Sequence, residues 1–307
     1  MINLSKEWRT DWGGTLHILN NKLEIEQSFV PSFNEINIVK VPVDHVVGYV
    51  SPFANGERLS ITGGLRSGKN PKNYRKKMTI QINDILNMSE LKDEFLKNGI
   101  VRVFDFLEQT SLEKISLSME KNVSYVNAFF LEGQNREVSD AEIQKLPVVT
   151  QQQLYKDIHE AASRGTGFLY GRYKIDQDSL LDLKDTLQLF NSESILKLIN
   201  EITGLCDLKS ADGQATRFRR GDFLTRHIDN IPGETRRIAY VLGLTPAWHP
   251  DWGGLLQLYE RDGTPTKSWS PVFNSLTLFD VDKVHSVTSI APFALKSRYS
   301  ITGWFRS

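Results

Sequence analysis

Cysteine is almost absent from this 307-residue sequence, which contains only Cys206. A single cysteine cannot form a disulfide within the chain, which excludes a disulfide-framework secreted protein and favours a reducing compartment. An excess of charge of one sign is also lacking, because 37 Lys and Arg balance 37 Asp and Glu. No basic excess therefore indicates a nucleic-acid partner. We expect Cys206 to be a small buried apolar residue.

Long apolar runs are missing too, since no stretch approaches the ~18 residues that a membrane helix needs. The first residues, MINLSKEWRTDWGG, lack the basic and then apolar pattern of a secretory signal. Hydrophobic residues make up 40% of the chain and charged residues 24%, which is ordinary globular usage. We therefore expect a soluble, cytoplasmic protein of about two domains, without a membrane partner.

An internal repeat organises the sequence. Residues 8–67 match residues 248–307 without a gap, and 23 of the 60 aligned residues are identical. WRTDWGG at 8–14 corresponds to WHPDWGG at 248–254, and RLSITGGLRS at 58–67 corresponds to RYSITGWFRS at 298–307. We interpret residues 1–67 as a partial, non-catalytic repeat and 78–307 as a complete catalytic domain. The Gly, Pro, Asn and basic residues of 68–77 predict a solvated linker.

In residues 78–307 the predicted secondary structure changes along the chain, from mostly helices to mostly strands. Helical patterns occupy 89–96, where Ser89 is the expected cap, 111–121, 151–163, and two segments between 178 and 204 divided at Asn191 and Ser192. One strand pattern lies at 99–107, and short strand patterns follow residue 211, at 214–218, 223–228, 237–244, 255–259, 275–280, 285–290 and 299–305. Helices followed by strands predict an α+β fold in which helices pack on an antiparallel β-sandwich.

Three residues of the strand-rich region form a candidate metal site. His227 and Asp229 are two residues apart, so on a strand their side chains point to the same face. His285 begins a different predicted strand. Two histidines and one carboxylate can occupy one face of an Fe(II) ion and leave positions open for cosubstrate and dioxygen. Arg298, thirteen residues after His285, has the forked guanidinium that suits bidentate capture of a carboxylate.

These residues lie in longer sequence segments that resemble those of a known family. FRRGDFLTRHID (218–229), TPAWHPDWGGLLQLY (245–259), SPVFNSLTLFDVDKVHSV (270–287) and RYSITGWFR (298–306) are similar to the 2-oxoglutarate- and Fe(II)-dependent dioxygenases of the prolyl 4-hydroxylase type. The resemblance is strongest to the bacterial and fungal branch that includes ribosomal-protein prolyl hydroxylases. It covers roughly residues 210–307 with high specificity and extends more weakly over 78–209.

The resemblance implies a double-stranded β-helix, or jelly-roll, with the metal in its open end. It implies that His227, Asp229 and His285 ligate Fe(II), that Arg298 binds the C5 carboxylate of 2-oxoglutarate, and that Thr302 and Trp304 line the cosubstrate pocket. With O2, such an enzyme hydroxylates a C–H bond and releases succinate and CO2. A carboxylate at 229, where halogenating relatives have a small residue, favours hydroxylation. Many members have a tyrosine near position 218, where this sequence has Phe218.

The resemblance leaves the substrate open. We expect a prolyl or similar residue of a protein or peptide, with a free amino acid or small metabolite as the alternative. A non-catalytic jelly-roll binding module is a third possibility, motivated by the degenerate first repeat. Selectivity is expected from loops at 130–150 and 230–250, with 130–147 a lid or a disordered loop. Trp248, Trp252, Gly253 and Gly254 predict either an aromatic-packed turn or a substrate-facing loop.

The first repeat keeps His45, Arg58 and Thr62 but has Gly64 in place of the tryptophan. Because no HxD pair precedes them, we do not expect His45 to bind a metal. A half jelly-roll exposes strand edges and an apolar face. Three interpretations follow: the segment docks on the catalytic domain as an extra partial sheet, it pairs with its counterpart in a homodimer, or the chain is a piece of a longer tandem-domain protein.

Overall fold

A computed structural model describes residues 1–8, 12–19, 25–48, 50, 54, 56–64, 80–83, 87–165 and 167–307. The chain divides into two compact units, Met1–Lys76 and Lys77–Ser307, which we call unit 1 and unit 2. The predicted linker at 68–77 lies outside the described residues.

Unit 1 is built from short antiparallel strands. These are β1 (Ile2–Asn3), β2 (Leu16–Leu19), β3 (Ile25–Phe29), β4 (His45–Val47) and β5 (Ser60–Ile61). They form the pair β1-β5 and a three-stranded sheet in the order β3-β2-β4. Leu16 and Ile18 of β2 are its buried apolar residues among those described, so the core of unit 1 is small.

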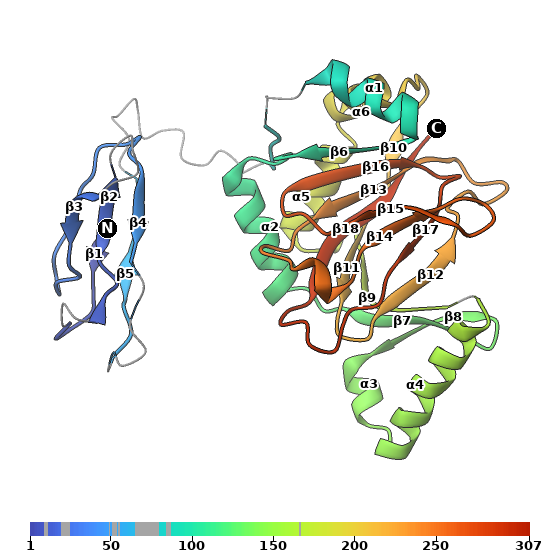
Figure 1. The fold of residues 1–307 in the computed structure, drawn as a ribbon, viewed down its shortest axis with the longest axis horizontal. Helices are drawn as coiled ribbons and strands as arrows, with labels where there is room; N and C mark the ends of the chain where they lie inside the picture. Colours follow the sequence, from blue (N-terminus) through green and yellow to red (C-terminus); the bar gives the residue numbers. More distant parts are fainter. Residues whose placement is uncertain are drawn as a thin grey trace. The chain divides into compact units, whose positions relative to one another are not determined.

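Unit 2 contains the remaining elements (Figure 1). Its strands are β6 (Ile100–Phe104), β7 (Val126–Leu131), β8 (Gln134–Ser139), β9 (Phe168–Lys174), β10 (Ser210–Ala211), β11 (Gln214–Phe218), β12 (Phe223–His227), β13 (Arg236–Gly243), β14 (Leu256–Tyr259), β15 (Pro265–Trp269), β16 (Ser275–Asp280), β17 (Val284–Val287) and β18 (Arg298–Arg306). Its helices are α1 (Met88–Asn98), α2 (Gln109–Lys121), α3 (Asp140–Gln144), α4 (Val148–Ser163), α5 (Leu181–Phe190) and α6 (Glu193–Thr203).

The two copies of the repeat also pair their strands in the same register. In unit 1, Leu16 pairs with Val47 and Ile18 with His45, and at the corresponding positions of unit 2 Leu256 pairs with Val287 and Leu258 with His285. The match includes residues before position 8, because the pair Ile2 and Ile61 corresponds to the pair Leu242 and Ile301. Unit 1 therefore has the strand arrangement of residues 241–307.

The strands of unit 2 form one strongly curled antiparallel sheet, ordered β15-β14-β17-β12-β9-β11-β18-β13-β16-β6, with β7, β8 and β10 added at the side. Curling brings residues of both halves of the sheet into one interior, where Leu256 and Phe279 pack together. This is the double-stranded β-helix, and the predicted α+β class with packed helices is confirmed.

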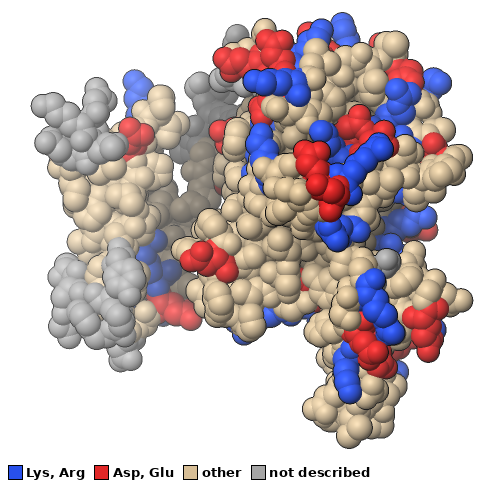
Figure 2. All heavy atoms as spheres, turned by 45° about the vertical axis from the view of Figure 1, so that its right-hand side comes forward, with Lys and Arg blue, Asp and Glu red and all other residues tan. Residues whose placement is uncertain are grey.

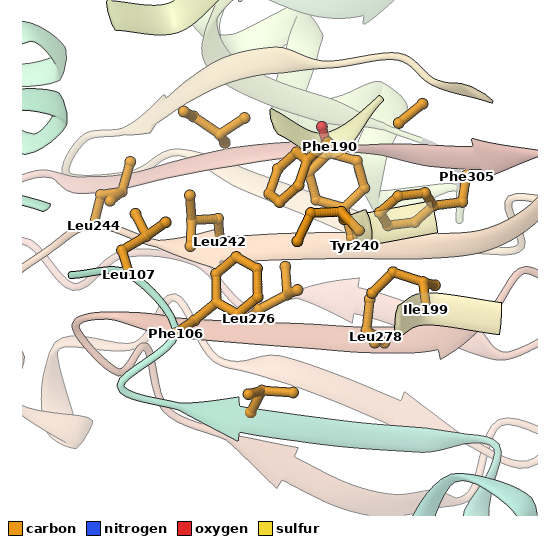
Figure 3. Close-up of a cluster of buried hydrophobic side chains, with 14 of the residues drawn as sticks. Phe106, Leu107, Phe190, Ile199, Tyr240, Leu242, Leu244, Leu276, Leu278 and Phe305 are labelled. Atoms are coloured by element: carbon orange, nitrogen blue, oxygen red, sulfur yellow. The ribbon is translucent and has the colours of Figure 1, made fainter. Parts of the chain in front are cut away.

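The main core lies between the convex face of the sheet and the helices. Figure 3 shows Phe190 of α5 beside Tyr240 of β13 and Phe305 of β18. The ring centroid of Phe190 lies 4.7 Å from that of Tyr240 and 6.0 Å from that of Phe305. Ile199 of α6 and Leu276 of β16 extend the same cluster. Burial of these side chains stabilises the packing of helices on the sheet, because each large apolar side chain contributes about 1.5–3 kcal/mol to the free energy of folding when fully buried. The helices thus support the sheet from the side opposite to its interior.

Most predicted helices and strands are present, and three local expectations are wrong. Residues 130–147 are not disordered, because they form the end of β7, β8 and α3, which begins with a capping box between Ser139 and Glu142. Cys206 is exposed, since it follows the helix-ending Gly204 outside the core. Asn87, not Ser89, caps α1 by accepting a hydrogen bond from the Glu90 N–H.

The surface carries both signs of charge. On the face shown in Figure 2, Lys and Arg are interspersed with Asp and Glu rather than separated by sign. Within the described part of the chain, the helices are all too short or too polar to cross a membrane.

Candidate active site

Two neighbouring strands place the predicted metal ligands. β12 and β17 pair antiparallel, and His227 lies directly opposite His285. Asp229 follows the end of β12, where its backbone N–H donates to the Val281 carbonyl at 3.0 Å. That bond fixes the residue after the strand ends, so the carboxylate faces the two imidazoles.

The three side chains converge on one point. Nε2 of His227 lies 3.5 Å from Oδ1 of Asp229, and Nε2 of His285 lies 3.6 Å from Oδ2. Nδ1 of each histidine lies 2.9 Å from a backbone carbonyl, that of Thr225 or Lys283. A carbonyl only accepts, so each Nδ1 carries a proton in these contacts and each Nε2 is free to bind a metal. The three form the only such metal-binding group found in the described residues.

Burial and the neighbouring charges both shift the pKa values of the triad. Burial alone would raise the pKa of Asp229, but a hydrogen bond with His227 and attraction to each imidazole in its protonated form hold that pKa below its ordinary value. Burial, and then repulsion by His227, lowers the pKa of His285 to about 4. At neutral pH the site therefore offers an ionised carboxylate and a neutral His285, the protonation states in which these groups ligate a metal.

The triad opens into a cavity of about 410 Å³ inside the curled sheet. This active-site cavity is also lined by Arg298, Thr302 and Trp304 of β18, so the structure brings together every predicted site residue. Other residues of its wall come from β7, β8, β9, β11, β12, β13, β14, β16 and β17. Such a cavity, mostly apolar with a few convergent polar groups, is the usual form of a small-molecule site.

Arg298 is a buried cation with unused hydrogen-bonding capacity. It is the first residue of β18, only 5% of its surface is exposed, and its Nη1 is buried without a hydrogen-bond partner. The ring of Phe218 lies under the guanidinium, with 5.3 Å between its centroid and Cζ. Burial of an unpaired charge is costly, so an anionic ligand that occupied the cavity would offset that cost.

Thr302 and Trp304 occupy the wall in different ways. The Thr302 hydroxyl accepts a hydrogen bond from Nε2 of Gln214 at 3.3 Å. The indole of Trp304 stacks against the guanidinium of Arg236, with 3.7 Å between the ring centroid and Cζ, and its interaction with Asp229 helps to lower the pKa of that carboxyl. Trp304 thus lies between the triad and Arg236, and Thr302 has Gln214 as its protein partner.

Sequence patterns missed a row of aromatic rings along one wall. Phe130, Phe168, Tyr170 and Phe218 follow one another with centroid distances of 6.4, 5.7 and 5.1 Å, and all four line the active-site cavity. They come from β7, β9 and β11. The alternation of Phe168 and Tyr170 within FLYGRYK was the available signal for β9, which was not predicted as a strand.

The segment around Trp248 is a packed turn. Trp248 and Trp252 meet edge to face at 5.3 Å, and Nε1 of Trp248 donates to the Gly253 carbonyl at 3.0 Å. Neither tryptophan lines the active-site cavity, so the aromatic-packed turn describes this segment. By contrast, both predicted selectivity loops contribute to the wall, through Phe130 and Asn135 and through Ile231 and Arg236.

Unit 1 lacks an equivalent site in its described residues. His45 is exposed, although its Nδ1 lies 3.1 Å from the Val43 carbonyl as in its counterpart His285. Nε of Arg58, the counterpart of Arg298, donates to the Gly14 carbonyl at 2.6 Å. Neither His227 nor Asp229 has a counterpart among the described residues of unit 1, so His45 lacks the other two ligands there.

Comparison with family models gives the chain its family. The model of the 2OG-Fe(II) oxygenase superfamily matches residues 1–66 and 213–306, together more than half of the chain. The chain belongs to this superfamily. The match covers both copies of the repeat, and the HxD and distal-histidine residues of the triad lie in its second segment.

Individual relatives lie among the prolyl hydroxylases. The chain is 27% identical over 263 residues to prolyl 3-hydroxylase OGFOD1 of Mus musculus, covering 82% of this chain and 43% of the relative. It is 34% identical over 120 residues to OGFOD1 of Xenopus laevis, covering 37% of this chain and 23% of the relative. The chain therefore spans less than half the length of these two relatives.

A solved structure supports the fold. An oxidoreductase of the 2OG-Fe(II) oxygenase family from Burkholderia pseudomallei aligns with a TM-score of 0.50 and 12% identity, covering 74% of this chain and 93% of that one.

Proposed function

We propose that the protein is an Fe(II)- and 2-oxoglutarate-dependent dioxygenase that hydroxylates a prolyl or similar residue of a protein or peptide, with release of succinate and CO2. The observation that carries the proposal is the convergence of His227, Asp229 and His285 in one cavity with the buried, unpaired Arg298. Two imidazole nitrogen donors and one carboxylate fit an Fe(II) ion, and the orphaned guanidinium fits a carboxylate.

Each part of the cavity has a separate task in this proposal. The triad would hold the iron, which activates dioxygen for hydroxylation coupled to decarboxylation of 2-oxoglutarate. Arg298 would bind the distal carboxylate and so orient the 2-oxo acid end toward the triad. Thr302 and Trp304 are proposed to line the cosubstrate side. The apolar walls would limit the access of water to the reacting groups.

The aromatic row supports a prolyl substrate. Rings of Phe130 and Phe168 offer flat apolar faces against which a pyrrolidine ring can pack. The curated relatives are prolyl 3-hydroxylases by name. A prolyl side chain placed on this wall would present its C–H bonds to the triad. A free amino acid or a small metabolite is the alternative that substrate screening must test.

The compartment and the partners are also part of the proposal. A single cysteine is compatible with a reducing compartment, and we propose the cytoplasm. We also propose that one role of unit 1 is to associate two copies of the chain.

The test is an anaerobic titration of the apo-protein with Fe(II) and 2-oxoglutarate, followed through the visible charge-transfer band of the chelate. We expect the band to saturate at about one iron per chain and to be lost in Asp229→Ala and Arg298→Ala. Release of succinate that depends on a prolyl peptide would then support the substrate. Absence of the band in a folded protein would contradict the enzyme proposal and leave the binding-module alternative.

A further inference from the structure

A second arginine lies close to Arg298 without any place in the proposed chemistry. Arg102 comes from β6, at the far end of the sheet order, and its side chain points into the sheet interior. In register, Arg102 pairs with Thr277 of β16, and Thr277 pairs with Val241 of β13. Val241 lines the active-site cavity. Arg102, Thr277 and Val241 therefore form one cross-strand row along the sheet that ends at the wall of the active-site cavity.

Both arginines line a second, smaller cavity. Arg102 and Arg298 share the wall of a space of about 10 Å³, and Val241 and Leu256 belong to this space and to the active-site cavity alike. A space of that size holds at most about one water molecule. It is too small for a ligand of its own, and both arginines contribute to its wall.

Arg102 is held in place by neutral groups. Its Nε donates to the Thr277 hydroxyl at 3.0 Å, its Nη1 donates to the Ser270 carbonyl at 2.9 Å, and its Cζ lies 4.6 Å from the Trp269 ring centroid. In the part of the chain that the structure describes, neither Arg102 nor Arg298 has an acidic partner. These contacts orient the side chain and leave its positive charge uncompensated.

Two uncompensated positive charges in one interior are unfavourable. Burial, and to a smaller extent the charge of Arg102, lowers the pKa of Arg298 to about 10. Burial also lowers the pKa of Arg102 to about 10. Both groups remain protonated at neutral pH, so their repulsion persists until an anion enters the active-site cavity.

We propose that Arg102 raises the affinity of the site for dicarboxylate cosubstrates by adding a second, partly buried positive charge near Arg298. The inference rests on the proposed function, since it concerns the cosubstrate of the same site. Arg298 contacts the distal carboxylate, and Arg102 acts on it through space. A ligand without a distal carboxylate gains nothing from Arg102.

The test compares a dicarboxylate and a monocarboxylate in Arg102→Met. The probes are 2-oxoglutarate and pyruvate, each titrated anaerobically into the Fe(II)-loaded protein and followed by the charge-transfer band. Because a unit charge several ångströms away in a partly screened interior contributes on this scale, we expect about tenfold weaker binding of 2-oxoglutarate. Pyruvate binding should change less than twofold. Arg102→Lys, which keeps the charge, should recover most of the 2-oxoglutarate affinity.

Matched variants separate this inference from a structural effect. Arg237→Met removes a positive charge from β13 that is paired with Asp207 and does not line the active-site cavity, so it should change neither affinity. Equal weakening of both probes in Arg102→Met, or no rescue by lysine, would mean that Arg102 only supports the fold. Unchanged 2-oxoglutarate affinity in Arg102→Met would overturn the inference and leave the proposed function intact. Failure of the wild-type protein to bind 2-oxoglutarate would overturn the proposed function itself.

If Arg102→Met fails to fold, the same two titrations are made with Arg102→Gln. Glutamine can still donate to the Thr277 hydroxyl or the Ser270 carbonyl while the charge is removed. The same selective loss of 2-oxoglutarate over pyruvate is expected. Thermal unfolding adds a readout that does not depend on turnover. Saturating 2-oxoglutarate should raise the Tm of the metal-loaded variant less than that of the wild-type protein.

Discussion

At the scale of single residues, a buried carboxyl outside the proposed chemistry sets a pH dependence. Asp222 is 3% exposed, in the turn that joins β11 to β12, and it accepts a hydrogen bond from the Arg219 N–H at 2.7 Å. Burial raises its pKa to about 7, although that hydrogen bond and the charge of Arg219 act in the opposite direction. The folded protein therefore favours the protonated carboxyl.

The sign of the effect on stability follows from this raised pKa. The stabilising contribution is complete below the unfolded value near 3.8 and is lost as the pH rises toward about 7. The full loss is on the order of 4 kcal/mol, at about 1.4 kcal/mol for each pKa unit. We expect the free energy of unfolding of Asp222→Asn, relative to that of the wild-type protein, to be higher at pH 8 than at pH 5. Chemical denaturation at both pH values measures this difference.

Removing a half-exposed carboxylate provides the control. Asp207→Asn disrupts the ion pair with Arg237 on the surface, where such pairs contribute about 1 kcal/mol or less. Its effect should be small at both pH values. An equal stability change in Asp222→Asn at pH 5 and pH 8 would contradict the expectation.

Single residues also show what could be predicted from the sequence. The triad and Arg298 were predictable because each lies in a distinctive phrase and because the chemistry demands those residue types. The role of Phe168 and Tyr170 was not, because the FLYGRYK segment is short, contains Gly171 and follows a long helix. Arg102 was hidden for another reason: its contact with Trp269 joins residues 167 positions apart, and only the sheet topology brings them together.

At the scale of elements, the β7-β8 hairpin forms part of the wall of the active-site cavity. Its turn residues Glu132 and Gly133 have φ values of 53° and 76°, the left-handed conformation of a two-residue type I′ turn. This turn sets the register that pairs Phe130 with Asn135, and both residues line the active-site cavity. The lid predicted for 130–147 is therefore an ordered hairpin and a helix.

The hairpin allows substrate and cosubstrate contacts to be separated. We expect Phe130→Ala to raise KM for a prolyl peptide substrate by about tenfold, because the loss of one aromatic contact face removes roughly 1–2 kcal/mol of binding. The affinity for 2-oxoglutarate should not change, since Phe130 is at the end of the aromatic row away from Arg298. Steady-state kinetics with each substrate varied in turn measure both quantities.

A phenylalanine outside the site controls for general effects of the substitution. Phe293→Ala changes a residue that is 63% exposed and does not line the active-site cavity, so it should leave both constants unchanged. A weaker affinity for 2-oxoglutarate in Phe130→Ala would contradict a role limited to the substrate.

At the scale of the whole molecule, the two copies of the repeat have the same register but different surroundings. Ile36 and Ile61 of unit 1 are each 58% exposed, whereas their counterparts Leu276 and Ile301 in unit 2 are buried under helices. The apolar face that unit 2 covers with its helices is open to solvent in unit 1, among the residues described. The predicted apolar face of a half jelly-roll is thus present.

Every residue that lines the active-site cavity belongs to unit 2. We therefore expect a chain lacking residues 1–76 to bind Fe(II) and 2-oxoglutarate within about twofold of the full chain. The anaerobic titration described above measures this affinity. A much weaker affinity in the shortened chain, while circular dichroism shows the same folded content for unit 2, would contradict the assignment of the site to one unit.

The same pair of chains tests the proposed homodimer. Light scattering should give a molar mass of about two chains for the full protein and one chain for the 77–307 protein if unit 1 mediates association. A monomer in both cases would remove the dimer alternative. Docking within one chain and origin from a longer tandem protein would then remain to explain unit 1.

The position of β18 has a consequence for the synthesis of the protein. This strand is the most C-terminal in the sequence, yet it lies between β11 and β13 in the middle of the sheet. During translation, β11 and β13 leave the ribosome long before their shared neighbour, so the curled sheet cannot close until residues 298–306 have emerged. Until then the nascent chain exposes apolar surface and unpaired strand edges, the state in which chaperones bind and aggregation begins. Closure of the sheet and assembly of the proposed cosubstrate site therefore both depend on β18, which carries Arg298.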